Sequence, residues 1–156
     1  MKNALLFGGL ALVLVTVNVA IAMKERLLAN GRTVLVELAP MDPRSIIAGD
    51  YMRLEYQLAR NANADWPRDG RMVVRLNNDG VAAFVRRDDG SALAPGELFL
   101  QYRRRAGRIR VGSDAFFFQE GHASRYADAR YGELRVARDG GTVLVGLRDE
   151  AGQPLR

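Results

Sequence analysis

The first thirty residues of the chain are dominated by one apolar segment. Residues 4–23, ALLFGGLALVLVTVNVAIAM, carry no charge, and as an α-helix they would be roughly 30 Å long, the thickness of a hydrocarbon core. The polar stretch KERLLAN continues the helical register to Gly31, which suits a C-terminal cap. The pattern predicts an N-terminal membrane anchor over residues 1–30.

A cleaved signal peptide is the alternative interpretation of this segment. Lys2 supplies the basic start, and Ala20-Ile21-Ala22 resembles a small-x-small cleavage site. The apolar stretch is longer than the usual signal-peptide core of about 7 to 15 residues. Its length therefore favours an uncleaved anchor.

Beyond Gly31 the hydrophobic period changes from helical to two, which is typical of strands. Turn signals at 77–80, 106–107 and 139–141 separate neighbouring strands and predict hairpins. The expected strands are 33–39, 51–58, 71–77, 81–87, 96–105, 108–112, 114–119 (as a buried strand), 132–138 and 142–148.

Two stretches depart from the alternation and predict short helical elements. Residues 45–48 follow a proline turn at Pro43 and are expected to form a brief helical or turn element. Residues 122–131 place apolar side chains at helical spacing and end before Gly132. The predicted fold class is thus mainly β: a transmembrane helix followed by one compact antiparallel β domain over residues 31–156, with a short helix near residues 122–131.

Composition supports one domain and narrows the chemistry. The chain has 156 residues, 48% of them hydrophobic, which is enough for one core and too few for two comfortable ones. It has no cysteine and one histidine, so we expect no disulfide, no metal site and no cofactor. The net charge of +5 comes with no nucleic-acid-binding motif, and no nucleic-acid partner is expected.

The stretch GDYMRLEY, residues 49–56, is the most distinctive short motif. In a strand it would alternate an apolar face with a polar one: the apolar face holds Met52, Leu54, Tyr56 and Leu58, and the polar face holds Tyr51, Arg53, Glu55 and Gln57. Asp50 shares the parity of the apolar face, where a carboxylate needs backbone N–H donors or a cation such as Arg44. We interpret the motif as mainly structural.

Charge alone leaves the orientation of the anchor open. Lys24, Arg26 and Arg32 after the apolar segment outnumber Lys2 before it, and the positive-inside rule would then keep the domain in the cytoplasm. A short N-terminal tail before one long apolar segment is equally the start of an exported domain.

The pattern P-x-D-P-R-S-x-x-x-G-D-Y-x-x-L-x-Y, residues 40–56, resembles the signature of the bacterial GDYXXLXY-motif proteins, and residues 116–147 are similar to a second block of that family. The resemblance implies a single-pass protein of the inner (cytoplasmic) membrane with its domain in the periplasm or otherwise outside the cytoplasm, and a polytopic membrane protein as partner. The motif residues are Pro43, Arg44, Gly49, Asp50, Tyr51, Leu54 and Tyr56.

A weaker likeness connects PMDPRSIIAGD, residues 40–50, with type I signal peptidases, which use a Ser-Lys dyad. Pro40 stands where the nucleophilic serine would be, and no lysine follows Lys24. A different hydrolase would have to use His122 with Glu120 or Asp128, and the chain has no G-x-S-x-G motif. We expect no catalytic residues, with a membrane-bound hydrolase as the alternative.

Five arginines cluster in YRRRAGRIR, residues 102–110, on a predicted hairpin, and form a candidate interaction surface. Their charge can protect a strand edge from pairing, and it can equally contact anionic lipid head groups or an acidic partner. They are Arg103, Arg104, Arg105, Arg108 and Arg110. Together these features predict a non-enzymatic accessory or binding module of the membrane, with its oligomeric state open.

Overall fold

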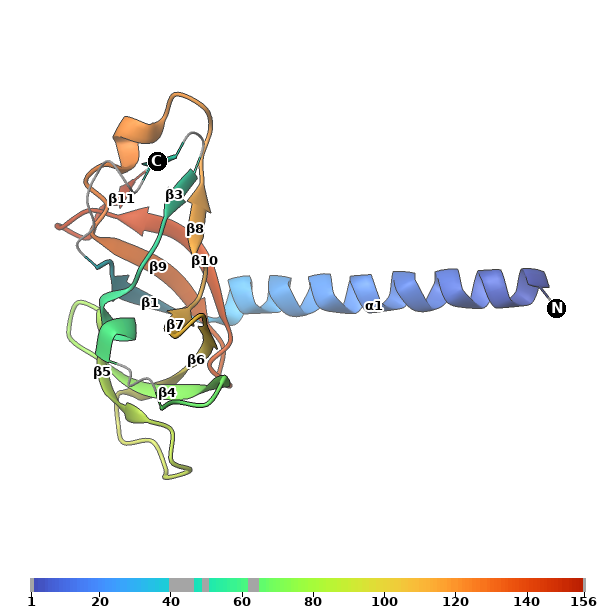
Figure 1. Ribbon diagram of the computed structural model, residues 1–156, viewed down its shortest axis with the longest axis horizontal. Helices are drawn as coiled ribbons and strands as arrows, with labels where there is room; N and C mark the ends of the chain where they lie inside the picture. The colour runs from blue at the N-terminus through green and yellow to red at the C-terminus, as the bar shows by residue number, and fades with distance from the viewer. Residues whose placement is uncertain (1, 40–46, 49–50, 62–64, 156) are drawn as a thin grey trace.

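The computed structural model describes residues 2–39, 47–48, 51–61 and 65–155. One long helix, α1 (Lys2–Asn30), precedes a domain made of short strands (Figure 1). The strands are β1 (Arg32–Glu37), β2 (Ile47–Ala48), β3 (Tyr51–Arg53), β4 (Asp69–Leu76), β5 (Ala82–Arg87), β6 (Glu97–Arg105), β7 (Arg108–Val111), β8 (Ala115–Phe117), β9 (Tyr131–Val136), β10 (Thr142–Arg148) and β11 (Pro154–Leu155). Two 3-10 turns, η1 (Gln57–Asn61) and η2 (Ala123–Tyr126), complete the described elements.

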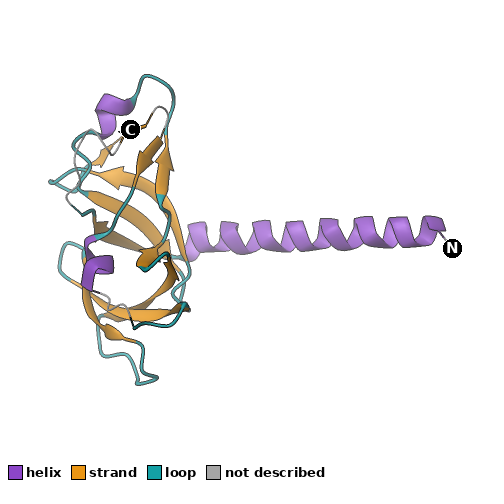
Figure 2. Cartoon of the chain, in the orientation of Figure 1, coloured by secondary structure: helices purple, strands orange, loops and turns teal. Residues whose placement is uncertain are grey.

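α1 projects from one side of the domain (Figure 2). From residue 7 to residue 30 its side chains are exposed, except that Leu27 is half-buried. Over Phe7–Asn30 the helix is long and apolar enough to cross a membrane, and none of that stretch is buried by the rest of the protein. Phe7 and Leu12, for example, are 69% and 68% exposed. Between residues 7 and 23 the mostly apolar side chains are therefore exposed around the whole circumference of the helix.

The strands form three antiparallel sheets. Two sheets have four strands, in the orders β1-β9-β10-β11 and β5-β4-β6-β7, and a small one has the order β2-β3-β8. The expected hairpins are present as β4/β5, β6/β7 and β9/β10. The mainly β, antiparallel fold class is confirmed.

Backbone hydrogen bonds join the two four-stranded sheets at two places. At one, the amide of Leu35 in β1 donates to the carbonyl of Gly80 at 2.9 Å. At the other, the amide of Gln101 in β6 donates to Gly140, in the β9–β10 turn, at 2.8 Å. Gly140 has φ +89°, and a Cβ there would lie 3.0 Å from the Cβ of Phe99, so only glycine permits this approach.

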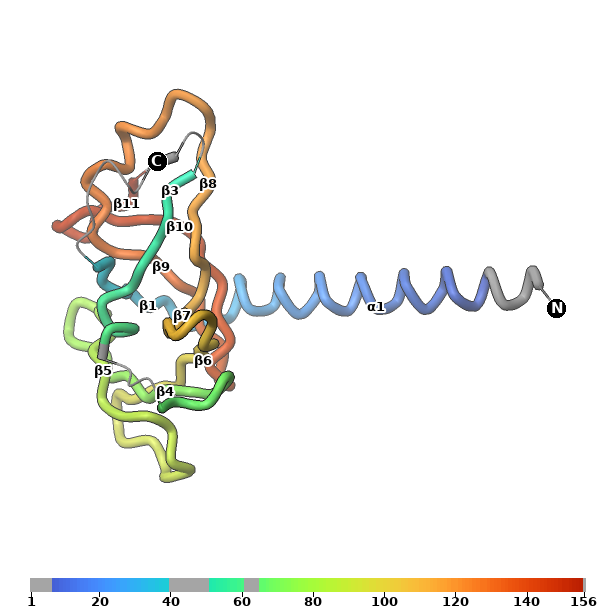
Figure 3. The backbone as a smooth tube through the Cα atoms, viewed as in Figure 1, coloured from blue at the N-terminus to red at the C-terminus, as the bar shows by residue number. Residues whose placement is uncertain are grey.

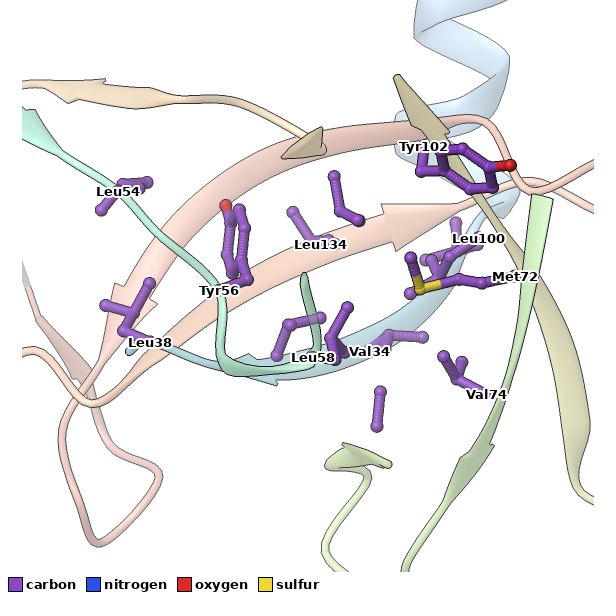
Figure 4. Packing of buried hydrophobic residues seen from close by; sticks show 14 of the residues in the cluster. Val34, Leu38, Leu54, Tyr56, Leu58, Met72, Val74, Leu100, Tyr102 and Leu134 are labelled. Carbon is purple, nitrogen blue, oxygen red and sulfur yellow. The ribbon is translucent and has the colours of Figure 1, made fainter. Parts of the chain in front are cut away.

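The core lies between these curled sheets and is built from alternate strand positions (Figure 4). In β1 and β9 the inward side chains are buried while their neighbours are more exposed, as the period of two requires. Strand β4 departs from this alternation: Met72, Val73 and Val74 are all buried, at an irregularity in its pairing with β5. The fully buried large side chains are Val34, Val36, Met72, Val73, Val74, Leu100, Val111, Leu134 and Leu147.

Three local predictions were wrong, and the short helix predicted near residues 122–131 is present but shorter than expected. The strand expected at 51–58 ends at Arg53, because Tyr56 bridges to Leu38 and the chain then turns into η1. The helix expected over 122–131 is only η2, because Tyr126 is drawn into the core between Phe116 and Phe118, at ring distances of 5.1 and 5.2 Å.

The other two corrections concern short strands. Ile47–Ala48 is strand β2 and pairs with β3, where a helical or turn element was expected. The strand expected at 114–119 is shortened to β8, and it is not buried, since Phe117 is 74% exposed. A sheet of three short strands covers only one face of β8, so its other face is left to solvent.

Candidate functional site

The GDYMRLEY motif is described from Tyr51 onward. Gly49 and Asp50 lie outside the described residues, as do Pro43 and Arg44, so the predicted role of Asp50 stays a prediction. Tyr51 is in β3, opposite Phe117 of β8, with the two ring centroids 5.7 Å apart. The first described part of the motif therefore lies in the smallest sheet.

The alternation predicted for the motif is confirmed at its apolar positions even where the strand has ended. Met52, Leu54, Tyr56 and Leu58 are each at most 4% exposed. The backbone between them is held by two long-range hydrogen bonds: the amide of Leu54 donates to Asp114 at 2.8 Å, and the carbonyl of Glu55 accepts from Ala39 at 2.7 Å. Tertiary hydrogen bonds thus keep an extended path where the strand ladder stops.

Tyr56 is the innermost polar residue of the motif. Its hydroxyl is buried, and within the described part of the chain it has no hydrogen-bond partner. Burial, assisted by the negative charge of Asp114, raises the pKa of Tyr56 far above its ordinary value of 10. The phenol therefore stays neutral at physiological pH and is unsuited to act as a base or nucleophile.

A groove lies where the second half of the motif faces the arginine hairpin β6–β7. We call it the motif groove; its volume is about 480 Å³. One wall is Arg53–Tyr56 with the start of η1, and the other is 107–111 with Asp114. An ion pair crosses it: Arg108 Nη1 lies 3.0 Å from Glu55 Oε1, with the side chains 74% and 36% exposed.

The wall formed by β7 is also the edge of a sheet. In the order β5-β4-β6-β7, strand β7 pairs on one side only within the described chain. The β6–β7 turn is tight, with φ +48° at Ala106 and +75° at Gly107, as a two-residue type I′ turn requires. The motif groove therefore combines a sheet edge, an exposed ion pair and the apolar motif residues beneath it.

The five arginines predicted as an interaction surface do not share one face. The register pairs Arg103 with Arg110 and Arg105 with Arg108, which places these four on the outward face of the hairpin. Arg104 pairs with Ile109 on the opposite face and is half-buried. The candidate surface is thus four arginines in two directly opposed pairs.

Candidate catalytic residues are not brought together at the motif groove. Its described lining contains no serine, histidine or lysine. His122 lies half-buried just before η2. The Ser113 hydroxyl donates to the carbonyl of Ala115 at 2.7 Å. Among the described residues, no group of three or more His, Asp or Glu side chains is placed to hold a metal ion.

Sequence reasoning missed a charged cluster around Glu97. The Glu97 side chain is 3% exposed and lies 3.0 Å from Arg75 and 2.8 Å from Arg86, while its Oε2 accepts the amide of Ala94 at 3.0 Å. Hydrogen bonds from Arg86 and then Ala94 hold the pKa of Glu97 below its ordinary value. No local sequence signal reveals this cluster, because the pairing of Arg75 with Glu97 depends on the register between β4 and β6, which are not consecutive strands.

The fold and the groove define a class of protein: a β domain carried on one long apolar helix, with a polar groove beside the motif. The chain belongs to the GDYXXLXY protein family, whose model matches residues 13–147. No curated protein and no solved structure matches the chain.

Proposed function

We propose that the protein is a non-enzymatic, single-pass accessory module of the cytoplasmic membrane that binds an integral membrane protein. α1 is the anchor: its length matches a hydrocarbon core, and its exposed apolar side chains are stable in lipid. The β domain is then held within reach of the membrane, where its partner is confined to the same plane.

The observation that carries this proposal is the Glu55–Arg108 ion pair at the edge of β7. An exposed pair of this kind contributes little to stability, so exchanging it for charges on a partner costs little. The edge of β7 offers backbone groups to an extended segment, which is a recurrent mode of peptide recognition. A loop of the partner with charges of both signs fits this groove.

The lining of the groove favours binding over hydrolysis. It lacks a serine, histidine or lysine within the described residues, and Tyr56 is kept neutral by burial. A hydrolase needs a base within hydrogen-bond reach of its nucleophile or water, and the two carboxylates of this lining, Glu55 and Asp114, are instead ion-paired with Arg108 and Arg110. For this reason the binding module is preferred to the hydrolase.

Photocrosslinking from native membranes tests the partner. A photoreactive residue replaces Arg53, which is exposed and lines the motif groove. In the control it replaces Arg87, which is exposed on β5 and does not line the motif groove. We expect a discrete crosslink to a membrane protein from position 53 only, and its loss when Arg108→Glu is added. Equal crosslinking from both positions, or none from position 53, would refute the proposal.

We further propose that the β domain lies outside the cytoplasm. The support is the family resemblance, because the charges flanking α1 do not decide the orientation. A phosphatase that folds only outside the cytoplasm, fused after Arg156, should be active. An inactive fusion at normal expression, together with an active cytoplasmic reporter at the same position, would show that the domain lies in the cytoplasm.

A further inference from the structure

The junction between α1 and the domain is held by specific contacts. The amide of Gly31 donates to Leu27 at 2.8 Å, and Arg135 of β9 donates to the carbonyl of Gly31 at 3.2 Å and to Thr33 at 2.7 Å. A Cβ on residue 31 would lie 2.4 Å from the Leu27 carbonyl oxygen. These contacts fix the orientation of the β domain relative to the axis of α1, and therefore which side of the domain lies next to the helix.

A second groove, which shares Arg110 and Asp114 with the motif groove, opens on that side. We call it the basic groove; its volume is about 830 Å³. Figure 3 shows β6 and β7 beside the base of α1, and Lys24 of the helix lines the groove together with the outward faces of these strands. Its charged lining residues are Lys24, Asp69, Arg71, Arg103, Arg105, Arg110 and Asp114.

Cations outnumber carboxylates in the basic groove, and two of the cations have protein partners. Arg71 pairs with Asp88 at 2.7 Å and stacks over the ring of Phe99, and Arg110 pairs with Asp114. For Arg103 and Arg105, no carboxylate lies within 4.0 Å among the described residues. In the register Arg103 has Asp69 of β4 on one side and Arg110 of β7 on the other. Arg105 faces Arg108, and like charges directly opposite destabilise a sheet.

The position of Lys24 places the groove at the level of lipid head groups. Lys24 is the first charged residue after the apolar segment, and α1 continues six positions beyond it, to Asn30. At 1.5 Å per residue this is roughly 9 Å, comparable to the head-group layer on one side of a bilayer, about 5 to 8 Å. At that level the cations that line the groove would lie beside lipid phosphates rather than beside acyl chains.

We infer that the basic groove binds the phosphate of an anionic phospholipid in the leaflet from which α1 emerges. Guanidinium groups donate paired hydrogen bonds to phosphate oxygens, and an anion between Arg103 and Arg105 offsets the repulsion across the hairpin. A bound head group would also fix the domain against the membrane. The inference rests on the proposed membrane anchor, but it is tested at Arg103 and Arg105, which line the basic groove and not the motif groove.

Native mass spectrometry of the full-length protein in mild detergent tests this site with phosphatidylglycerol and phosphatidylcholine as probes. The test variant is Arg103→Gln with Arg105→Gln. The control, Arg87→Gln with Arg125→Gln, removes the same charge from exposed positions outside the groove. Because each cation near an anionic surface is worth about a fivefold change in affinity, we expect the test variant to lose roughly 25-fold of the preference for phosphatidylglycerol.

The control variant should keep that preference, and Arg103→Lys with Arg105→Lys should keep most of it. Fluorescence of the buried Trp66 verifies that each variant is folded. An unchanged preference in the test variant, or an equal loss in the control, would overturn the assignment. So would protection against urea by inorganic phosphate without any preference for phosphatidylglycerol, since the ligand would then be a soluble anion.

Discussion

The ring of Tyr56 packs against Gly132 of β9 so closely that a Cβ on residue 132 would lie 2.9 Å from the Cε1 atom of the tyrosine. The same Cβ would lie 3.3 Å from the hydroxyl oxygen. Gly132 thus provides the space in which the last residue of the motif is buried, and Figure 4 shows Tyr56 among the core side chains beside Leu134.

Gly132→Ala should therefore destabilise the domain by about 1 to 3 kcal/mol, because the buried ring cannot move away without disturbing the core. Gly146→Ala on the neighbouring strand β10 is the matched control, since nothing lies within 4 Å of a Cβ there. The measurement is urea unfolding of the full-length protein in detergent, followed by the fluorescence of Trp66. Equal effects of the two substitutions would contradict the close packing.

Leu54→Ala should cost about 2 to 5 kcal/mol, whereas Arg53→Ala should change the free energy of unfolding by less than about 0.5 kcal/mol. Leu54 is 4% exposed, so its truncation loses apolar burial and leaves a cavity, while Arg53 is exposed. The same urea experiment applies. A large loss for Arg53→Ala would mean that the polar face of the motif also contributes to folding.

Tyr56→Phe should stabilise the protein by about 1 kcal/mol, because it removes a buried hydroxyl that has no partner among the described residues. Tyr56→Ala, by contrast, should cost about 3 to 5 kcal/mol through the loss of the ring. Thermal unfolding of both variants gives the comparison. A clear loss of stability in Tyr56→Phe would show that the hydroxyl does make a hydrogen bond in solution.

Stability should fall as the pH drops below the ordinary Glu97 pKa of 4.5. The folded-state pKa of Glu97 is lowered, chiefly by the hydrogen bond from Arg86, so its contribution is fully present above the unfolded value and is lost as pH falls through the folded value. Glu97→Gln should make the protein less stable at neutral pH and less sensitive to acid as the pH falls below 4.5.

Some acid sensitivity should remain in Glu97→Gln, because Asp88 and Asp89 also have lowered pKa values. Glu150→Gln, at an exposed position after β10, serves as the control and should leave the pH profile unchanged. Denaturant midpoints measured across the pH range give the profile. If Glu97→Gln kept the full acid sensitivity, the carboxylates responsible would lie elsewhere.

The period of the hydrophobic pattern was sufficient to predict α1, the hairpins β4/β5, β6/β7 and β9/β10, and the buried face of the motif. These features depend on local physics: the length of an apolar helix, the φ values that a two-residue turn needs, and the alternation of side chains along an extended chain. The alternation of side chains continues at Leu54 and Tyr56, although the strand ends at Arg53.

The ends of elements were predicted less well, because distant residues decide them. The bridge between Tyr56 and Leu38 stops β3, and the packing of Tyr126 between Phe116 and Phe118 shortens the predicted helix. Neither contact is visible in the residues that flank the boundary. Tertiary packing can offset the small differences in local propensity that would otherwise set such boundaries.

By itself the sequence determined that this protein has an apolar helix and an antiparallel β domain, and which motif and arginine cluster to examine. Only the tertiary structure brought Glu55 within 3.0 Å of Arg108, 53 residues away, and separated Arg104 from the other four arginines. It also placed Lys24 beside Arg103 and Arg105 in one groove. Periodicity specifies which face of an element is buried, whereas the register between strands and the curl of the sheets specify which exposed faces meet.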